Sequence, residues 1–383
     1  MKKLILITFI LIGLLLIGIG TFIYLPTIVQ GLDFSDRDFK KVALKDFISR
    51  DQDSLWMETA EVMLPEHPDG YVLIVPDRDY DRDWNSPGNQ TRPGLRFARR
   101  LIERNLAVIR YSPPGSVNEE IDLVDPARSV EAFLDVAEAF FTARQQAALP
   151  EAPITVLAMG EGCMISALAL QDTLALRILK PHRLILSSCA YPDTLLNGWA
   201  GRIFYNMRLS GVSEENMDAA SKIWEKHRAS IEKGQIPEID EDAWEDRLEK
   251  MKEAKLPSDL LALEKTLSHL YRPANRDWTR AAVQLDFEPI LEDLAQARPE
   301  MEMIHVLGEY DEEVHPEDRK KQENMVRSSS IPNYRFILLE KTDHGLVVRD
   351  QPPASPVENM MRRRDPFAEF SPGLLDLLAP KQD

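Results

Sequence analysis

The sequence predicts an α/β protein built on a mostly parallel sheet that is covered by helices on both faces. Strand-length runs such as 71–75 and 154–158 are apolar at nearly every position, which is typical of strands buried on both sides. These runs alternate with segments of helical periodicity such as 127–144, and that alternation is typical of parallel connections. A chain of 383 residues is long enough to bury a sizeable core.

The same patterns place each element along the chain. Strands are expected at 71–75, 107–111, 154–158, 183–188, 302–307 and 334–339, and helices at 94–104, 127–144 and 164–174. Between 191 and 299 the pattern changes to long charged helices, for example 214–233 and 242–255, with no strand-like run. We expect this insertion to form a helical lid whose charged faces are solvated.

The amino-terminal segment predicts a membrane anchor over residues 1–30. Lys2 and Lys3 precede an uncharged stretch, 4–24, which as a helix would reach about 30 Å, the thickness of a bilayer core. A cleaved signal peptide is the alternative, but its apolar region is normally shorter and ends in small residues. The two lysines should stay cytoplasmic, which would place the bulk of the chain on the periplasmic or extracellular side of a bacterial inner membrane.

The rest of the chain divides into three expected parts. A mixed-charge stalk, 31–55, would carry a short amphipathic helix around 39–48. The main domain would cover 56–350 with the lid at 191–299 inside it. A proline-rich tail, 351–383, would be loosely ordered.

Charge and cysteine content exclude several classes of function. A formal net charge of -17 and no long run of Lys and Arg argue against nucleic acid as a partner. The only two cysteines, Cys163 and Cys189, provide no Cys-rich zinc site. They stand at the carboxyl ends of consecutive elements and are expected to lie close together, so a disulfide is possible if their Cα atoms come within about 7 Å.

Three motifs occur in an informative order. The stretch "ITVLAMGEGCMISALAL" begins at Ile154 and reads as a buried strand, a tight glycine turn and a helix of small residues, the layout of a nucleophile elbow. The motif "VLGEYDEEVHP" follows the strand at 302–307, and "LLEKTDHGL" closes the last strand. Each motif alone is weak evidence for a known type of fold, but the three motifs in this order along the chain are a specific signal.

On these motifs the chain, from about 70 to 348, resembles the α/β-hydrolases, in particular the dienelactone hydrolase and serine-aminopeptidase-like group. The elbow of that group reads G-H-S-E-G-G, which puts Gly160 at the nucleophile position and Glu161 directly after it. The resemblance implies that Asp311 is the catalytic acid and His344 the catalytic histidine. It also implies a hydrolase fold that takes a small acyl or peptide ligand and needs no cofactor.

A second catalytic component departs from the family pattern. Active members read H-G-S-G after the first core strand and donate backbone N–H groups there to the oxyanion. This chain reads Val75, Pro76, Asp77 and Arg78. Proline has no N–H, and a carboxylate opposes a developing negative charge. Asp77 and Glu161 are therefore predicted to lie in an altered oxyanion-hole region.

Without the serine, the favoured interpretation is an inactive relative kept for binding or for structure. The alternative is an active hydrolase of ester, thioester or peptide bonds. In it, His344 and Asp311 would act on water, or a relocated nucleophile would replace the serine, the candidates being Cys163, Ser112 and Ser116.

A metal site is a weaker alternative. His305 and His315 lie near the acidic run 309–313, and together these residues could offer imidazole and carboxylate ligands. The run reads equally as an ordinary loop that carries the catalytic acid, so no metal is expected.

Overall fold

The computed structural model describes residues 39–47, 55–77, 80–85, 92–115, 124–189, 194–234, 257–352 and 368–379, with isolated positions at 242, 243, 246, 249, 250 and 358. The expected anchor, 1–30, lies outside these residues. Within the described part of the chain no helix is both long enough and apolar enough to cross a membrane.

Eight strands form one sheet in the order β1-β2-β4-β3-β5-β6-β7-β8. Their bounds are β1 Lys40–Ala43, β2 Glu61–Leu64, β3 Gly70–Val75, β4 Leu106–Arg110, β5 Ile154–Met159, β6 Arg183–Ser187, β7 Glu302–Gly308 and β8 Tyr334–Leu339. The strands β4, β3, β5, β6, β7 and β8, in that order across the sheet, pair with one another in parallel. Strand β2 is antiparallel to both of its neighbours, β1 and β4. The predicted α/β fold with a mostly parallel sheet is confirmed.

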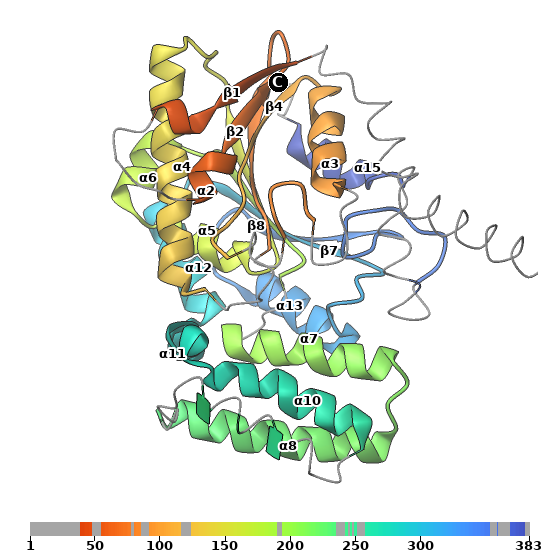
Figure 1. Ribbon diagram of the computed structural model, residues 1–383. Coiled ribbons are helices and arrows are strands. Elements are labelled where there is room, and N and C mark those ends of the chain that lie inside the picture. The colour runs from red at the N-terminus through yellow and green to blue at the C-terminus, as the bar shows by residue number, and fades with distance from the viewer. Residues whose placement is uncertain are drawn as a thin grey trace, which may run out of the picture.

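Helices cover both faces of the sheet, as Figure 1 shows. The helices on one face are α4 Pro126–Gln146, α5 Gly162–Ala169, α12 Phe287–Ala297 and α13 Pro316–Ser328, and those on the other are α3 Pro93–Ile102 and α15 Pro372–Leu378. Alternation along β3 explains the two layers, because Leu73 and Val75 pack towards α4 and α5 whereas Val72 and Ile74 pack towards α3 and α15. Three short helices complete this part, α2 Leu55–Thr59, η1 Leu44–Phe47 and α6 Thr173–Ile178.

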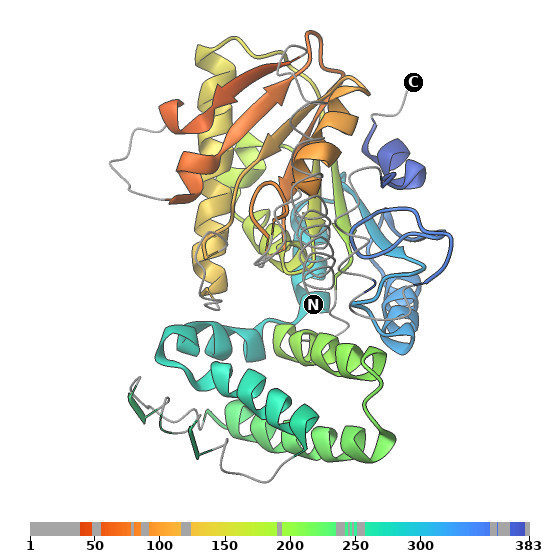
Figure 2. The same ribbon diagram turned by 45° about the vertical axis from the view of Figure 1, so that its right-hand side comes forward.

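A separate helical layer lies below the sheet in Figures 1 and 2. It contains α7 Leu195–Leu209, α8 Glu214–Glu232, α10 Ser258–Ser268 and α11 Arg276–Gln284, with the short turns η2 His269–Tyr271 and η3 Pro273–Asn275. This layer lies within the segment 191–299, where the sequence predicts a lid. We call α7, α8, α10 and α11 the lid helices. Helix α12 differs from that expectation, because it packs against α5 as one of the helices that cover the sheet.

Both ends of the described chain differ from the sequence expectation. Where the sequence predicted a stalk with an amphipathic helix around 39–48, residues 40–43 form the edge strand β1 and residues 44–47 the short helix η1, and Val42 and Leu44 are buried against the core. In the expected loose tail, Phe370 packs against Phe97 with ring centroids 5.0 Å apart, and α15 buries Leu374. Aromatic and leucine burial therefore holds this part of the tail on the sheet.

Candidate functional site

The predicted elbow is present at the carboxyl end of β5. Gly160 follows the strand and has a φ of +53°, a left-handed conformation that favours glycine. Helix α5 begins two residues later at Gly162. A Cβ on Gly162 would lie 2.6 Å from the carbonyl oxygen of Val75, so this glycine allows the turn to approach the end of β3.

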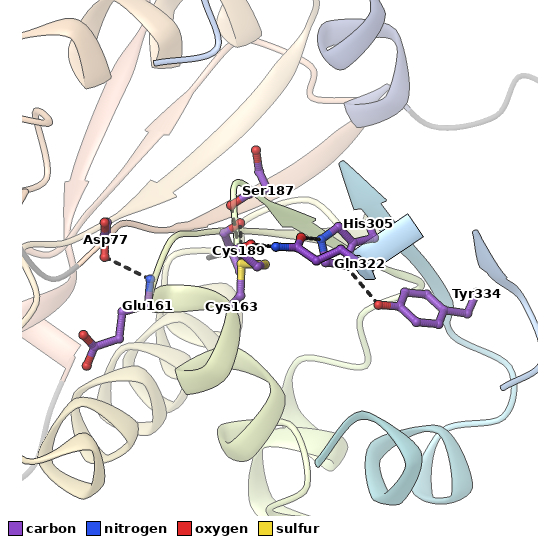
Figure 3. The surroundings of a disulfide bond; sticks show 9 residues. Asp77, Glu161, Cys163, Ser187, Cys189, His305, Gln322 and Tyr334 are labelled. Atoms are coloured by element: carbon purple, nitrogen blue, oxygen red, sulfur yellow. Dashed lines mark hydrogen bonds between the residues drawn. A yellow bond between two sulfur atoms is a disulfide. The ribbon is translucent and has the colours of Figure 1, made fainter. Parts of the chain in front are cut away.

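The carboxylate of Asp77 occupies the volume that a serine side chain would need. Asp77 follows β3 and is 2% exposed. A Cβ built on Gly160 would lie 2.3 Å from Asp77 Cγ and 2.4 Å from its Oδ2. The backbone N–H of Glu161 donates to Asp77 Oδ1 at 2.9 Å, and Figure 3 shows this bond. The structure thus brings Asp77 and Glu161 together at the elbow, and Asp77 takes the N–H expected to serve an oxyanion.

Asp311 and His344 are also brought together. Asp311 follows β7, His344 lies in the turn after β8, and His344 Nδ1 is 3.0 Å from Asp311 Oδ1. Both residues are buried. Burial is the strongest influence on Asp311 and by itself would raise the pKa of its carboxyl, but the charge and hydrogen bond of His344 help to hold that pKa below its usual value. This pair has the geometry of a histidine oriented by an acid.

The other ring nitrogen of His344 faces a second acid. His344 Nε2 lies 3.4 Å from Glu313 Oε2, on the side of the ring that would take a proton from a nucleophile in a serine enzyme. Arg202 of α7 links this acid to the elbow, because its Nη1 donates to Asp77 Oδ2 at 3.0 Å and its Nη2 donates to Glu313 Oε2. A cation from the lid therefore bridges two core carboxylates.

Arg202 and Glu313 are the residues that the sequence motifs did not identify as part of the site. Glu313 lies in the acid motif but two positions beyond the residue that the motif selects. Arg202 belongs to no motif and is one of many charged residues in the lid. The substitution of Pro76 and Asp77 for the family residues was the available signal that the site had changed.

The lid contacts the elbow at a second point. Glu161 is buried, and its Oε1 accepts a hydrogen bond from Trp278 Nε1 of α11 at 3.1 Å. The ring of Trp278 in turn packs against Trp199 of α7. Two lid helices thus meet the residues around Gly160.

Two of the three alternative nucleophiles are engaged elsewhere. Cys163 forms a disulfide with Cys189, and their Cα atoms are 6.1 Å apart, within the limit required. Ser112 is buried, and its Oγ accepts the backbone N–H of Arg82 at 3.1 Å. Ser116 lies outside the described residues. A disulfide-bonded sulfur has no thiolate to attack a carbonyl, so Cys163 is not a nucleophile in this form.

A buried polar network supports the disulfide, as Figure 3 shows. Gln322 Nε2 donates to the carbonyl oxygen of Cys189 at 2.7 Å, and Gln322 Oε1 lies 2.7 Å from His305 Nε2. Because the amide oxygen can only accept, His305 carries its proton on Nε2 and Nδ1 accepts from the hydroxyl of Tyr334 at 3.1 Å. Burial lowers the pKa of His305 to about 4.

The residues first considered for a metal are used for structure. His305 belongs to the network above, and His315 Nδ1 accepts the backbone N–H of Glu317 at the start of α13. The structure instead brings Asp77, Glu313 and His344 together, with one candidate ligand atom from each within 4.8 Å of the others. Imidazole and carboxylate are suitable metal ligands, but the guanidinium of Arg202 already binds both carboxylates.

No protein-family model and no curated protein matches the sequence. Among solved structures, the chain is similar to the α/β hydrolase GrgF from Penicillium sp. sh18, with 13% identity, a TM-score of 0.41, and coverage of 84% of this chain and 93% of that one. It is similar to a dienelactone hydrolase from Anabaena variabilis, with 10% identity, a TM-score of 0.37, and coverage of 79% and 87%. A putative esterase from Staphylococcus aureus gives 11% identity, a TM-score of 0.40, and coverage of 90% and 89%.

Replacing the elbow glycine tests whether Asp77 fills the space that a nucleophile side chain at position 160 would occupy. Gly160→Ser should lower the free energy of unfolding by about 3 kcal/mol, because the new Cβ displaces a buried, paired carboxylate. Asp77→Gly in the same chain should make the serine easier to accommodate. The double variant should therefore lose less free energy of unfolding than the two single variants lose together, by at least about 1 kcal/mol. Urea denaturation of all four proteins measures this coupling.

Gly201→Ser is the matched control for that cycle. A Cβ at Gly201 would meet only Asp318 Oδ2, at 3.8 Å, which is ordinary contact. Its effect should stay within about 1 kcal/mol. Strictly additive effects of Gly160→Ser and Asp77→Gly would show that the two positions do not share one volume.

The buried imidazole of His305 predicts a dependence of stability on pH. Its folded pKa of about 4 lies below the ordinary value of 6.5, so the unfolded chain binds the proton first as pH falls. Stability should therefore decrease between pH 6.5 and pH 4, by on the order of 3 kcal/mol from this residue. His305→Gln should flatten the pH profile of the urea midpoint in that window, and an unchanged slope would contradict the assignment.

Proposed function

We propose that this chain is an α/β-hydrolase-like protein that has lost the serine mechanism and acts as a binding or structural module. One observation carries the proposal, namely that the Asp77 carboxylate fills the space beside Gly160 in which a nucleophile side chain would stand. The motif order and the contact between Asp311 and His344 support descent from a hydrolase.

Each component of acyl transfer is engaged in another interaction. The reaction needs a nucleophile, a base that takes its proton, and donors for the oxyanion. Gly160 has no side chain, the Glu161 N–H is bonded to Asp77, and His344 Nε2 faces Glu313. Three simultaneous changes are harder to reverse than one lost hydroxyl.

The location of Asp77 favours one specific form of the active alternative. Its carboxylate lies beside the elbow, with an oxygen within 4.8 Å of a ring nitrogen of His344. Such a carboxylate could attack an acyl carbon, expel the leaving group and form an anhydride. Water deprotonated by His344 would then cleave that anhydride and restore the acid. Arg202 and Glu313 would have to move aside first, which is why we favour the non-catalytic function.

We also propose that residues 1–30 anchor the chain and that the folded part lies on the extracytoplasmic side. The uncharged stretch 4–24 behind Lys2 and Lys3 supports an anchor. The disulfide between Cys163 and Cys189 supports an oxidising compartment, because such bonds are rare in the reducing cytosol.

Active-site labelling separates the candidate functions. The wild-type chain should form no fluorophosphonate adduct, and its hydrolysis of p-nitrophenyl acetate should equal that of His344→Ala, because no nucleophile is available. Labelling of a serine that requires His344 would contradict the proposal. Acylation of the peptide that contains Asp77, together with activity lost in Asp77→Asn, would instead establish the carboxylate nucleophile.

Mass spectrometry of the protein from native cells, with the membrane and soluble fractions analysed separately, tests the location. The mature chain should keep residues 1–30, and alkylation before reduction should modify neither Cys163 nor Cys189, because both are bonded. A soluble chain that begins between residues 20 and 30 would refute the anchor. Two alkylated cysteines would refute the oxidising compartment.

A further inference from the structure

The lid contributes a guanidinium to the core site. Arg202 donates from Nη1 to Asp77 Oδ2 and from Nη2 to Glu313 Oε2. The two acceptors come from different loops, one after β3 and one after β7. A planar fork that spans two carboxylates is a geometry that arginine provides and lysine does not.

The core side of this contact is strongly acidic and buried. Asp77, Asp311, Glu312 and Glu313 are all buried. His344 lies among them, with Asp311 on one ring nitrogen, Glu313 near the other and Glu312 on its backbone N–H at 3.2 Å. Buried carboxylates are costly unless a positive charge or hydrogen bonds compensate them. Removing the guanidinium would therefore leave a pair of acceptors that favours another cation.

The part of α7 that carries Arg202 is less buried than the part before it. The buried residues of α7 are Leu195, Leu196, Gly198 and Ala200. From Gly201 onwards the helix contributes no buried side chain, and the Arg202 side chain is 17% exposed, against 2% for that of Asp77. Withdrawal of Arg202 would open the two carboxylates, and it would require Ile203, Phe204 and Met207, which are partly buried against the core, to loosen their packing.

We propose that Arg202 is an internal ligand, and that Asp77 and Glu313 form a receptor for an external guanidinium group when the lid moves away. The inference rests on the proposed binding function and names its ligand class. In the closed state the lid arginine occupies the receptor. An arginine side chain of another chain, or a small guanidinium compound, would compete for the same two oxygens.

Chemical rescue tests this receptor in the full-length chain. Arg202→Ala removes the internal ligand, and N-methylguanidine at about 10 mM should then raise the melting temperature by about 2 °C or more, since a ligand that binds only the folded state stabilises it. N-methylurea, a neutral compound of the same shape, should give no shift. Wild type should not respond, because Arg202 fills the site, and Arg202→Ala combined with Asp77→Asn should lose the rescue.

Several results would overturn the inference. These are an equal response of wild type and Arg202→Ala, an equal effect of N-methylurea, and stabilisation by Zn²⁺ or Mg²⁺ but not by N-methylguanidine. If Arg202→Ala does not fold in buffer, its refolding yield with N-methylguanidine should exceed that with N-methylurea, and equal yields would count against the receptor. Rescue in a protein that proves to be an active hydrolase would refute the proposed non-catalytic function alone. Failed rescue in an inactive protein would refute the receptor alone.

Discussion

The contact between the Asp77 carboxylate and the elbow determines how the rest of the site is arranged. With no side chain at Gly160, the carboxylate can approach the turn and accept the Glu161 N–H. A buried carboxylate needs compensation, and Arg202 provides it from the lid while also binding Glu313. The elbow, the acid loop and the lid are thereby joined through charge.

The disulfide is a second constraint on the same region. Cys163 lies in the first turn of α5 and Cys189 just after β6, so the bond ties the elbow helix to the neighbouring strand. Gln322 and His305 extend this tie to α13 and β7. The elbow is therefore held from one side by covalent and buried neutral contacts and from the other by an ion-pair network. Contacts on both sides of the turn support the binding or structural function proposed above.

Much of the fold could be predicted from the sequence, because continuous apolar strands and helical periodicity are local signals. The elbow at Gly160 and the pairing of Asp311 with His344 followed from motifs that fix a residue to the end of a strand. Strands β1 and β2 and helix α15 were not expected. Residues 40–43 and 61–64 are too few to show a period, and α15 depends on distant partners, because its leucines belong to the same core cluster as Phe97 and Trp84.

The composition of the site was harder to predict than its position. Arg202 and Asp77 are 125 residues apart, and no local pattern indicates that a lid arginine will reach the core. The sequence showed that Asp77 replaces an oxyanion donor, but not that its side chain turns into the space beside Gly160. That orientation depends on the Glu161 N–H and on the guanidinium of Arg202, both of which meet the carboxylate only in the assembled fold.

A crystal structure of the protein at pH 7 would show, in the electron density around Gly160, where the Asp77 carboxylate lies. We predict that it packs against the glycine, with one oxygen on the Glu161 N–H and the other on Arg202. Density that shows Asp77 turned away from the elbow, with a water-filled space above Gly160 and His344 Nε2 open to it, would contradict the role of Asp77 described above.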